Sequence, residues 1–191
     1  MFKTAALITA AGSSTRMGSH KALLKYNQSL SFLDKLIETY SEYGCKKIVI
    51  TLNNELFNEL CNYKNEKVLI VLNNKPELER LYSIQLGLQT IENYDFCFVQ
   101  SIDNPFTQIQ LLTKLFTNKK NDFYIVPTIK NKGGHPVLIN KMIIDYICKI
   151  DTYNLKFNDV LKQFKRESIE VDDESIFYNI NTMETYQQLI R

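Results

Sequence analysis

The 191-residue chain lacks the features that mark several large classes of protein. Its four cysteines lie far apart and form no Cys-x-x-Cys pair, which argues against a zinc site or a disulfide framework and favours reduced thiols. A net charge of +2 is too small to favour a nucleic-acid partner. No apolar run approaches membrane-spanning length, and no signal peptide precedes the first apolar segment. We therefore expect a cytoplasmic protein that binds neither nucleic acid nor membrane.

The remaining composition is that of an ordinary globular protein, with 45% hydrophobic and 23% charged residues. The chain shows no internal repeat, no low-complexity segment and no linker rich in Pro, Gly or Ser. We therefore expect residues 1–191 to form a single domain with a sizeable core.

Apolar runs alternate with segments of helical spacing along the whole chain. The expected strands are residues 4–10, 47–52, 68–72, 96–100, 123–126, 136–139, 169–171 and 176–180. The expected helices are residues 32–43, 55–62, 81–91, 107–116, 142–148, 155–164 and 182–190. Nearly continuous apolar strands that alternate with helices predict an α/β fold. The expected architecture is a doubly wound, mostly parallel sheet with helices on both faces, a Rossmann-like arrangement.

Capping patterns support two of these helices. Ser31 with Asp34, and Gly44 at the far end, are typical of the start and stop of the helix at 32–43. Thr107 with Gln110 predicts a capping box for the helix at 107–116.

Ligands of such sheets bind beyond the carboxyl ends of the strands. The loops after the first, third and fourth strands read TAAGSSTRMGSHK, NNKPELERLYS and SIDNPFT, and we expect all three to open on one edge. In the first loop, Gly12 and Gly18 permit a backbone that turns N–H groups towards an anion, while Arg16 and Lys21 add charge. The spacing fits neither the P-loop nor the dinucleotide fingerprint. The competing interpretation is a surface turn with incidental charge, and His20 is left without a role.

The stretch LITAAGSSTRMGSHKALL resembles the signature of the MobA-like nucleotidyltransferases, L-x-A-A/G-G-x-S-x-R-M-G-x-x-K-x-L-L. The resemblance implies that this loop wraps the triphosphate of an NTP. The nucleotide-binding residues that it implies are Ala10, Ala11, Gly12, Ser13, Ser14, Arg16, Gly18 and Lys21, together with Asn73 and Ser83 of the third-strand loop. The competing interpretation of Ser83 is a residue at the start of a helix, and that of Gly87 is a position where two segments pack closely.

SIDNPFT resembles the family's G-D-x-P motif, whose Asp holds the catalytic Mg²⁺, with Ile102 in place of the usual glycine. The resemblance makes Asp103 a metal ligand and, with Arg16 and Lys21, a catalytic residue. The competing interpretation is an Asx turn before a helix. At the other end, IFYNINTMETY resembles the family's closing segment, which implies that Asn181 is a second metal ligand. Asn181 with Glu184 equally fits a helix cap.

KNKGGHPVLI resembles a Gly-His-Pro segment typical of the cytidylyl-transferring, MocA-like branch, and this makes Gly134 and His135 substrate-side residues. The Ala-Ala-Gly of the first loop favours the same branch. Gly133 and Gly134 also fit a simple turn between strands.

These patterns together predict a Mg²⁺-dependent enzyme that moves a nucleoside monophosphate, CMP from CTP, onto a small phosphorylated acceptor and releases pyrophosphate. The resemblance suggests molybdopterin, or its metallated form, as the acceptor. One alternative is a sugar or polyol phosphate acceptor. Another is a non-catalytic nucleotide-binding protein, which Ile102 and Asn181 keep open.

Overall fold

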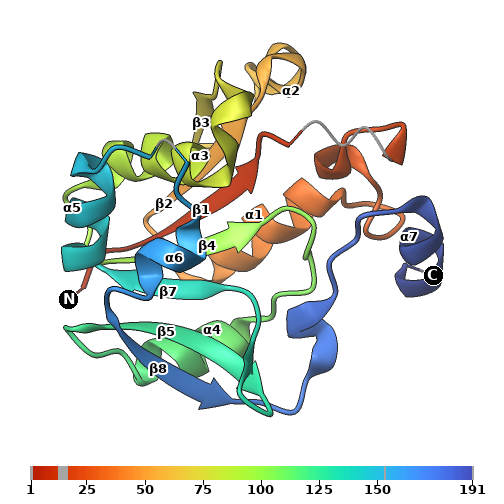
Figure 1. Cartoon of the computed structure of the whole chain (residues 1–191). Coiled ribbons are helices and arrows are strands. Elements are labelled where there is room, and N and C mark those ends of the chain that lie inside the picture. Colours follow the sequence, from red (N-terminus) through yellow and green to blue (C-terminus); the bar gives the residue numbers. More distant parts are fainter. Residues whose placement is uncertain (1, 13–16, 153, 191) are drawn as a thin grey trace.

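The computed structural model describes residues 2–12, 17–152 and 154–190, and its elements follow one another as strands and helices in alternation (Figure 1). The strands are β1 (Thr4–Ala10), β2 (Lys47–Leu52), β3 (Val68–Leu72), β4 (Phe96–Ser101), β5 (Phe123–Ile129), β6 (Lys132–Gly133), β7 (Val137–Asn140) and β8 (Lys165–Glu170). They form one sheet in the order β3-β2-β1-β4-β7-β5-β6, with β8 paired to β5. The four strands from β3 to β4 are parallel, whereas β7 runs antiparallel to both β4 and β5.

Helices cover both faces of this sheet, as the alternation of apolar segments predicts. They are α1 (Phe32–Tyr43), α2 (Asn54–Leu60), α3 (Glu79–Leu88), α4 (Ile109–Thr117), α5 (Lys141–Lys149), α6 (Phe157–Leu161) and α7 (Met183–Leu189). Successive side chains of a strand point to opposite faces, so Ala6 and Ile8 of β1 pack with α1 and α4, while Ala5 and Leu7 pack with α3, α5 and α6. The predicted α/β fold, with a mostly parallel sheet between two layers of helices, is confirmed.

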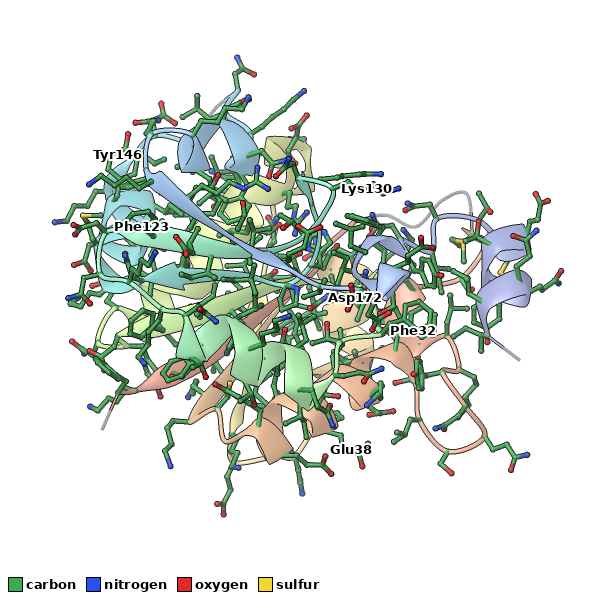
Figure 2. The ribbon with its side chains drawn as sticks, turned by 90° about the horizontal axis from the view of Figure 1, so that it is seen from below. Phe32, Glu38, Phe123, Lys130, Tyr146 and Asp172 are labelled. Carbon is green, nitrogen blue, oxygen red and sulfur yellow. The ribbon has the colours of Figure 1, made fainter. Side chains whose placement is uncertain are left out.

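Helix α1 begins and ends where its sequence predicts. The Ser31 hydroxyl accepts a hydrogen bond from the Asp34 amide, and the Asp34 carboxylate accepts one from the Ser31 amide. Gly44 ends the helix at φ 99°, a left-handed conformation that suits glycine. Figure 2 shows the outward face of the helix, where the exposed side chain of Glu38 points away from the body of the molecule.

The antiparallel part of the sheet departs further from the sequence prediction. Residues 176–180 are not a strand: the first two end a 3₁₀ turn at Glu174–Phe177, and the other three follow it. The turn is held by local bonds such as Tyr178 N–H to Ser175 C=O. Strand β8 starts four residues earlier than expected, because most of its side chains are polar and exposed and so give no apolar run. Figure 2 shows Phe123 and Lys130 at opposite ends of the neighbouring strand β5.

Gln100, near the end of β4, is the centre of a buried polar network. Its Oε1 accepts hydrogen bonds from the Tyr40 hydroxyl at 3.0 Å and from the Thr107 hydroxyl at 2.8 Å. Its Nε2 donates to the carbonyls of Ser101 at 3.0 Å and Asn104 at 2.8 Å. The side-chain amide of Gln100 thus uses all four of its hydrogen-bonding positions. Its bonds to the carbonyls of Ser101 and Asn104 hold the turn that carries Asp103. Thr107 is therefore not a helix cap, and α4 begins two residues later than predicted.

Two further features complete the fold. Helix α7 has no buried residue and lies at one margin of the molecule (Figure 1), where its Tyr186 ring lies 5.9 Å from the Phe32 ring of α1. Among the residues that the structure describes, no helix is both long and apolar enough to span a bilayer.

Candidate functional site

The loops after β1, β3 and β4 meet at one edge of the sheet, as predicted, and enclose a cavity of about 230 Å³. We call this the edge cavity. It is lined by Thr9, Ala11, Gly12, Lys21, Glu79, Arg80, Ser83, Ser101, Ile102 and Asp103. Residues from the first loop, the third-strand loop and the Asp103 turn therefore share one cleft, although the chain separates Thr9 from Asp103 by 94 positions.

Gly12 and Gly18 have different roles in the first loop. Gly18 has φ 65°, which only glycine adopts without strain. Gly12 is not in the left-handed region, and a Cβ atom built on it would have no neighbour within 4 Å among the residues that the structure describes. That Gly12 helps to turn N–H groups towards an anion stays a prediction; what the structure shows is a glycine in the lining of the edge cavity. Ala11 also lines this cavity, whereas Ala10 is buried at the end of β1.

Three residues predicted for this loop, Ser13, Ser14 and Arg16, lie outside the residues that the structure describes. Their assignment as nucleotide-binding or catalytic residues stays a prediction. The neighbouring Met17 is buried in the core between α1 and the sheet, so the far end of the loop is anchored.

Lys21 links the first loop to the far end of the chain. It begins the 3₁₀ turn Lys21–Leu23, and its Nζ donates a 2.6 Å hydrogen bond to Oδ1 of Asn181. Asn181 is not a helix cap: Thr182 caps α7, its hydroxyl accepting from the Thr185 amide. The structure thus places the side-chain oxygen of Asn181 on Lys21, and its role as a metal ligand stays a prediction.

Asp103 presents an oxygen with no partner to the edge cavity. Its backbone carbonyl accepts from the Ile180 amide at 2.8 Å, but its Oδ1 is buried and has no hydrogen-bond partner in the described residues. The Asx-type contact in this turn is made instead by Asn104, whose Oδ1 accepts from the Phe106 amide. Ile102, which stands where the family has glycine, is buried against the core. The turn therefore accommodates this replacement and still aims a carboxylate at the cavity.

This arrangement fits a magnesium ion shared with phosphates. No group of three or more His, Cys, Asp or Glu in the described ranges could hold a metal ion with protein ligands alone. Mg²⁺ does not need one, since one or two carboxylates, substrate phosphates and water fill its octahedral shell. The unpartnered Oδ1 of Asp103 is the kind of ligand that such a site requires.

Asn73 and Ser83 form a support behind the edge cavity. The Asn73 amide donates to Oγ of Ser83 at 2.8 Å, and its Oδ1 accepts from the Lys75 amide at 2.8 Å. Asn73 is completely buried, so it holds the loop in shape, while Ser83 lines the cavity. Ser83 is not a helix-start residue, because α3 begins four residues earlier. Gly87 is a point of close packing, since a Cβ there would lie 2.3 Å from a methyl carbon of Leu7.

A second cavity, of about 410 Å³, lies beside the antiparallel part of the sheet; we call it the basic cavity. Among the described residues, its lining contains the cations Arg80, Lys132, Lys162 and Arg166 and no carboxylate. It also contains the two predicted substrate-side residues, Gly134 and His135, brought there by the segment between β6 and β7.

Gly134 does not form the turn in this segment. That turn is made by Lys130 and Asn131, both with positive φ (49° and 65°), which connect β5 to β6. Gly134 instead allows the segment to approach Ile176, because a Cβ would lie 2.6 Å from the Ile176 carbonyl oxygen. The next residue strengthens this contact, since the His135 amide donates to the same carbonyl at 3.0 Å.

His135 is a neutral imidazole at neutral pH. Its pKa is lowered from 6.5 to about 4: burial is the largest cause, the positive charge of Arg80 acts in the same direction, and the negative charge of Asp103 opposes both. Its Nδ1 is buried without a hydrogen-bond partner in the described residues. The imidazole therefore adds polarity to the basic cavity without adding charge.

Arg80 is a candidate site residue that the sequence interpretation missed, although it lies between Asn73 and Ser83, at the start of α3. It lines both the edge cavity and the basic cavity. Burial lowers the pKa of its guanidinium, and the negative charge of Asp103 partly compensates. Its position in a loop already expected to face the ligand was the signal that could have identified it.

Comparison with known proteins agrees with this geometry. A molybdenum cofactor cytidylyltransferase of Escherichia coli K12 is 27% identical over 183 residues, which cover 94% of this chain and 92% of that protein. A probable molybdenum cofactor guanylyltransferase of Clostridium perfringens strain 13 is 28% identical over 203 residues, which cover 100% of this chain and 98% of that protein. The crystal structure of Rv0371c from Mycobacterium tuberculosis H37Rv shares the fold, with a TM-score of 0.81, 16% identity and 98% coverage of both chains. Residues 6–166 match the MobA-like NTP transferase domain, and the chain belongs to that family of nucleotidyltransferases.

Proposed function

We propose that this protein transfers CMP from CTP to a small phosphorylated acceptor and releases pyrophosphate. The observation that carries the proposal is the edge cavity itself, where a glycine-lined loop and the ammonium of Lys21 share a cleft with the unpartnered carboxylate oxygen of Asp103. Cations on one side and a free carboxylate on the other are complementary to a metal-bound triphosphate.

In this proposal the triphosphate lies along the first loop. Gly12 leaves the space that the phosphates need, and Lys21 places a full positive charge beside them. Asn181 orients Lys21 by accepting its hydrogen bond, so the ammonium is directed before substrate arrives. A charge held in place costs no reorganisation during the reaction, which is how enzymes stabilise a leaving group such as pyrophosphate.

Asp103 is the residue that would hold Mg²⁺, with Asn181 as a second candidate. A bound Mg²⁺ supplies neutralisation of the phosphate charge and a fixed geometry for the α-phosphate. The network around Gln100 holds the turn of Asp103 rigidly, which keeps its carboxylate directed into the cleft.

The reaction itself is an in-line displacement at phosphorus. An oxygen of the acceptor phosphate attacks the α-phosphorus and forms a new P–O bond. The bond from the α-phosphorus to the bridging oxygen breaks, and pyrophosphate leaves with the electron pair. Because the attacking oxygen is already anionic, the step requires no protein nucleophile and no general base.

The preference for CTP and the identity of the acceptor rest on the resemblance of the Gly-His-Pro segment and the first loop. The named relatives include one cytidylyltransferase and one guanylyltransferase, so the base is a point to be measured. We propose molybdopterin or its metallated form as the acceptor, in line with the names of these two relatives. A sugar or polyol phosphate is the alternative acceptor.

The test is a panel of the four common NTPs against each candidate acceptor, with pyrophosphate release measured with Mg²⁺ and after its removal by chelation. We expect release with CTP and a molybdopterin acceptor, and none without the metal. Release with a sugar or polyol phosphate instead would keep the chemistry and replace the acceptor. Tight CTP binding without pyrophosphate from any acceptor would instead identify a non-catalytic nucleotide-binding protein.

A further inference from the structure

Arg80 occupies the junction between the two cavities of the molecule. It contributes to the lining of the edge cavity together with Lys21 and Asp103, and to the lining of the basic cavity together with Lys132 and Arg166. No other residue lines both cavities among those that the structure describes. A group that bridges two substrates during transfer must lie at such a junction.

The guanidinium of Arg80 forms no ion pair with a carboxylate in the described part of the chain. Its Nε is buried and has no hydrogen-bond partner among the described residues. Asp103 acts on it through its charge, without a direct ion pair. A partly buried cation without a bonded anion is less stable than a paired one, and a bound anion would offset much of that cost.

The backbone before Arg80 adds to the same interpretation. Glu79 begins α3 with φ 62°, a left-handed conformation that is unfavourable for a residue with a side chain. Such strain persists where surrounding structure imposes it and is often found beside functional groups. Here it occurs at the residue that leads directly to Arg80.

The other cations of the basic cavity are placed to complete an anion site. Lys132 has its Nζ 4.7 Å from the centre of the Phe177 ring, and an Arg166 Nη2 donates to the Asn131 carbonyl at 3.3 Å. Lys162 is paired with Asp159 at 2.7 Å on an exposed surface and is the least available of the four. Arg80 is thus the cation nearest to the transfer centre, with Lys132 and Arg166 further along the cavity wall.

We propose that Arg80 binds the acceptor's phosphate and directs its attacking oxygen towards the α-phosphorus of the nucleotide, making Arg80 a catalytic residue of the transfer. This inference rests on the proposed function for the identity of the reaction. The anion binding that it requires is a property of Arg80 and the basic cavity alone. An arginine fits the task because its planar fork can hold two phosphate oxygens at once.

The experiment measures phenyl phosphate, a simple phosphomonoester, and CTP with Mg²⁺ in separate calorimetric titrations. Four proteins are compared: the parent, Arg80→Gln, Lys21→Gln, and Lys149→Gln as a charge-matched control on an exposed helix end. We expect Arg80→Gln to raise the Kd for phenyl phosphate about 10- to 100-fold, the size of one charged hydrogen-bonding group. Lys21→Gln should weaken CTP strongly and phenyl phosphate little, and the control should change neither.

Equal phenyl phosphate affinity in the parent and Arg80→Gln would overturn the inference. So would a loss of phenyl phosphate binding in Lys21→Gln that matches the loss in Arg80→Gln, because the phosphate would then lie in the edge cavity. If Arg80→Gln does not fold, Arg80→Lys serves as the test variant. Lysine keeps the positive charge but loses the planar guanidinium, so we expect a Kd for phenyl phosphate between those of the parent and a variant without the charge. The proposed function could fail while the anion site is confirmed. This would be the result if the parent bound phenyl phosphate through Arg80 but neither bound CTP nor released pyrophosphate.

Discussion

The parallel half of the sheet, strands β3, β2, β1 and β4, differs in character from the mixed half, strands β7, β5, β6 and β8. Every residue of β1 is buried, whereas only one residue of β8 is. The edge cavity belongs to the parallel half and combines Lys21 and Arg80 with the carboxylates of Glu79 and Asp103. The basic cavity lies largely against the mixed half and has cations without a carboxylate.

This difference indicates a division of tasks between the halves. A parallel sheet gathers its loops at the carboxyl ends of the strands, and here that edge holds the charges of both signs that a metal–triphosphate complex needs. The basic cavity beside the mixed half is lined by positive charges, which suit an anion that carries no bound metal ion. Under the proposed function, the transfer takes place at the parallel half, and the mixed half binds the second substrate.

The largest expected effect tests the parallel half directly. Asp103→Asn removes the negative charge but keeps the shape of the side chain, so we expect activity to fall about 100- to 1,000-fold with loss of the Mg²⁺ response. Pyrophosphate release across a Mg²⁺ titration gives the measurement, with Asp172→Asn, an exposed acid, as the control. A variant with the parent's metal titration would make Asp103 a residue of the turn only.

The second prediction concerns the network that holds the Asp103 turn. Gln100→Leu leaves the Tyr40 and Thr107 hydroxyls and two carbonyls without their buried partner, so we expect a loss of about 3 kcal/mol in unfolding free energy. Chemical denaturation measures it, and Gln163→Leu, on the exposed surface beside Tyr146, is the control. Unchanged stability would show that the turn holds itself without Gln100.

Two glycines give a sharper comparison of the halves. Gly12→Ala places a methyl group in the open space of the edge cavity, so we expect CTP to bind about tenfold more weakly with the fold intact. Gly134→Ala forces a methyl group onto the Ile176 carbonyl, so we expect a stability loss of about 1–3 kcal/mol. Calorimetry and thermal denaturation of both variants separate the outcomes, and the reverse pattern would contradict the division.

The smallest effect concerns the cysteines. Burial raises the pKa of Cys45 to about 12 and that of Cys148 to about 11, and it raises the pKa of Cys97 well above its usual value. The thiolate is the reactive form, so these three should react slowly at pH 8. Cys61 is exposed, and we expect timed alkylation followed by mass spectrometry to find it modified first. Early labelling of Cys97 would mean that the sheet opens more readily than its burial implies.

The sequence predicted the parallel half almost to the residue, because buried parallel strands are continuous apolar runs. The strands at residues 4–10, 47–52 and 68–72 have the expected bounds. The mixed half was harder to predict because β8 is an exposed, polar strand with no apolar run, and because Ile176 and Ile180 are buried without forming a strand. Apolar pattern alone cannot distinguish a strand from an irregular segment pressed against the core.

The candidate site divides in the same way. Gly18, Lys21 and Asp103 were found from the position of their loops after strands, and the structure brings the last two together. Arg80 was missed because a single arginine near a helix start has the same appearance in sequence whether it is solvated or buried. The hydrogen bond between Lys21 and Asn181 joins residues 160 positions apart, a pairing for which one sequence carries no local signal.

The two ends of the described chain complete the site together: besides Lys21 and Asn181, Ile180 bonds to Asp103, and the Tyr186 hydroxyl donates to the Lys25 carbonyl. A chain that lost residues 180–186 would therefore keep all eight strands and still lose these three contacts with the two loops that line the cleft.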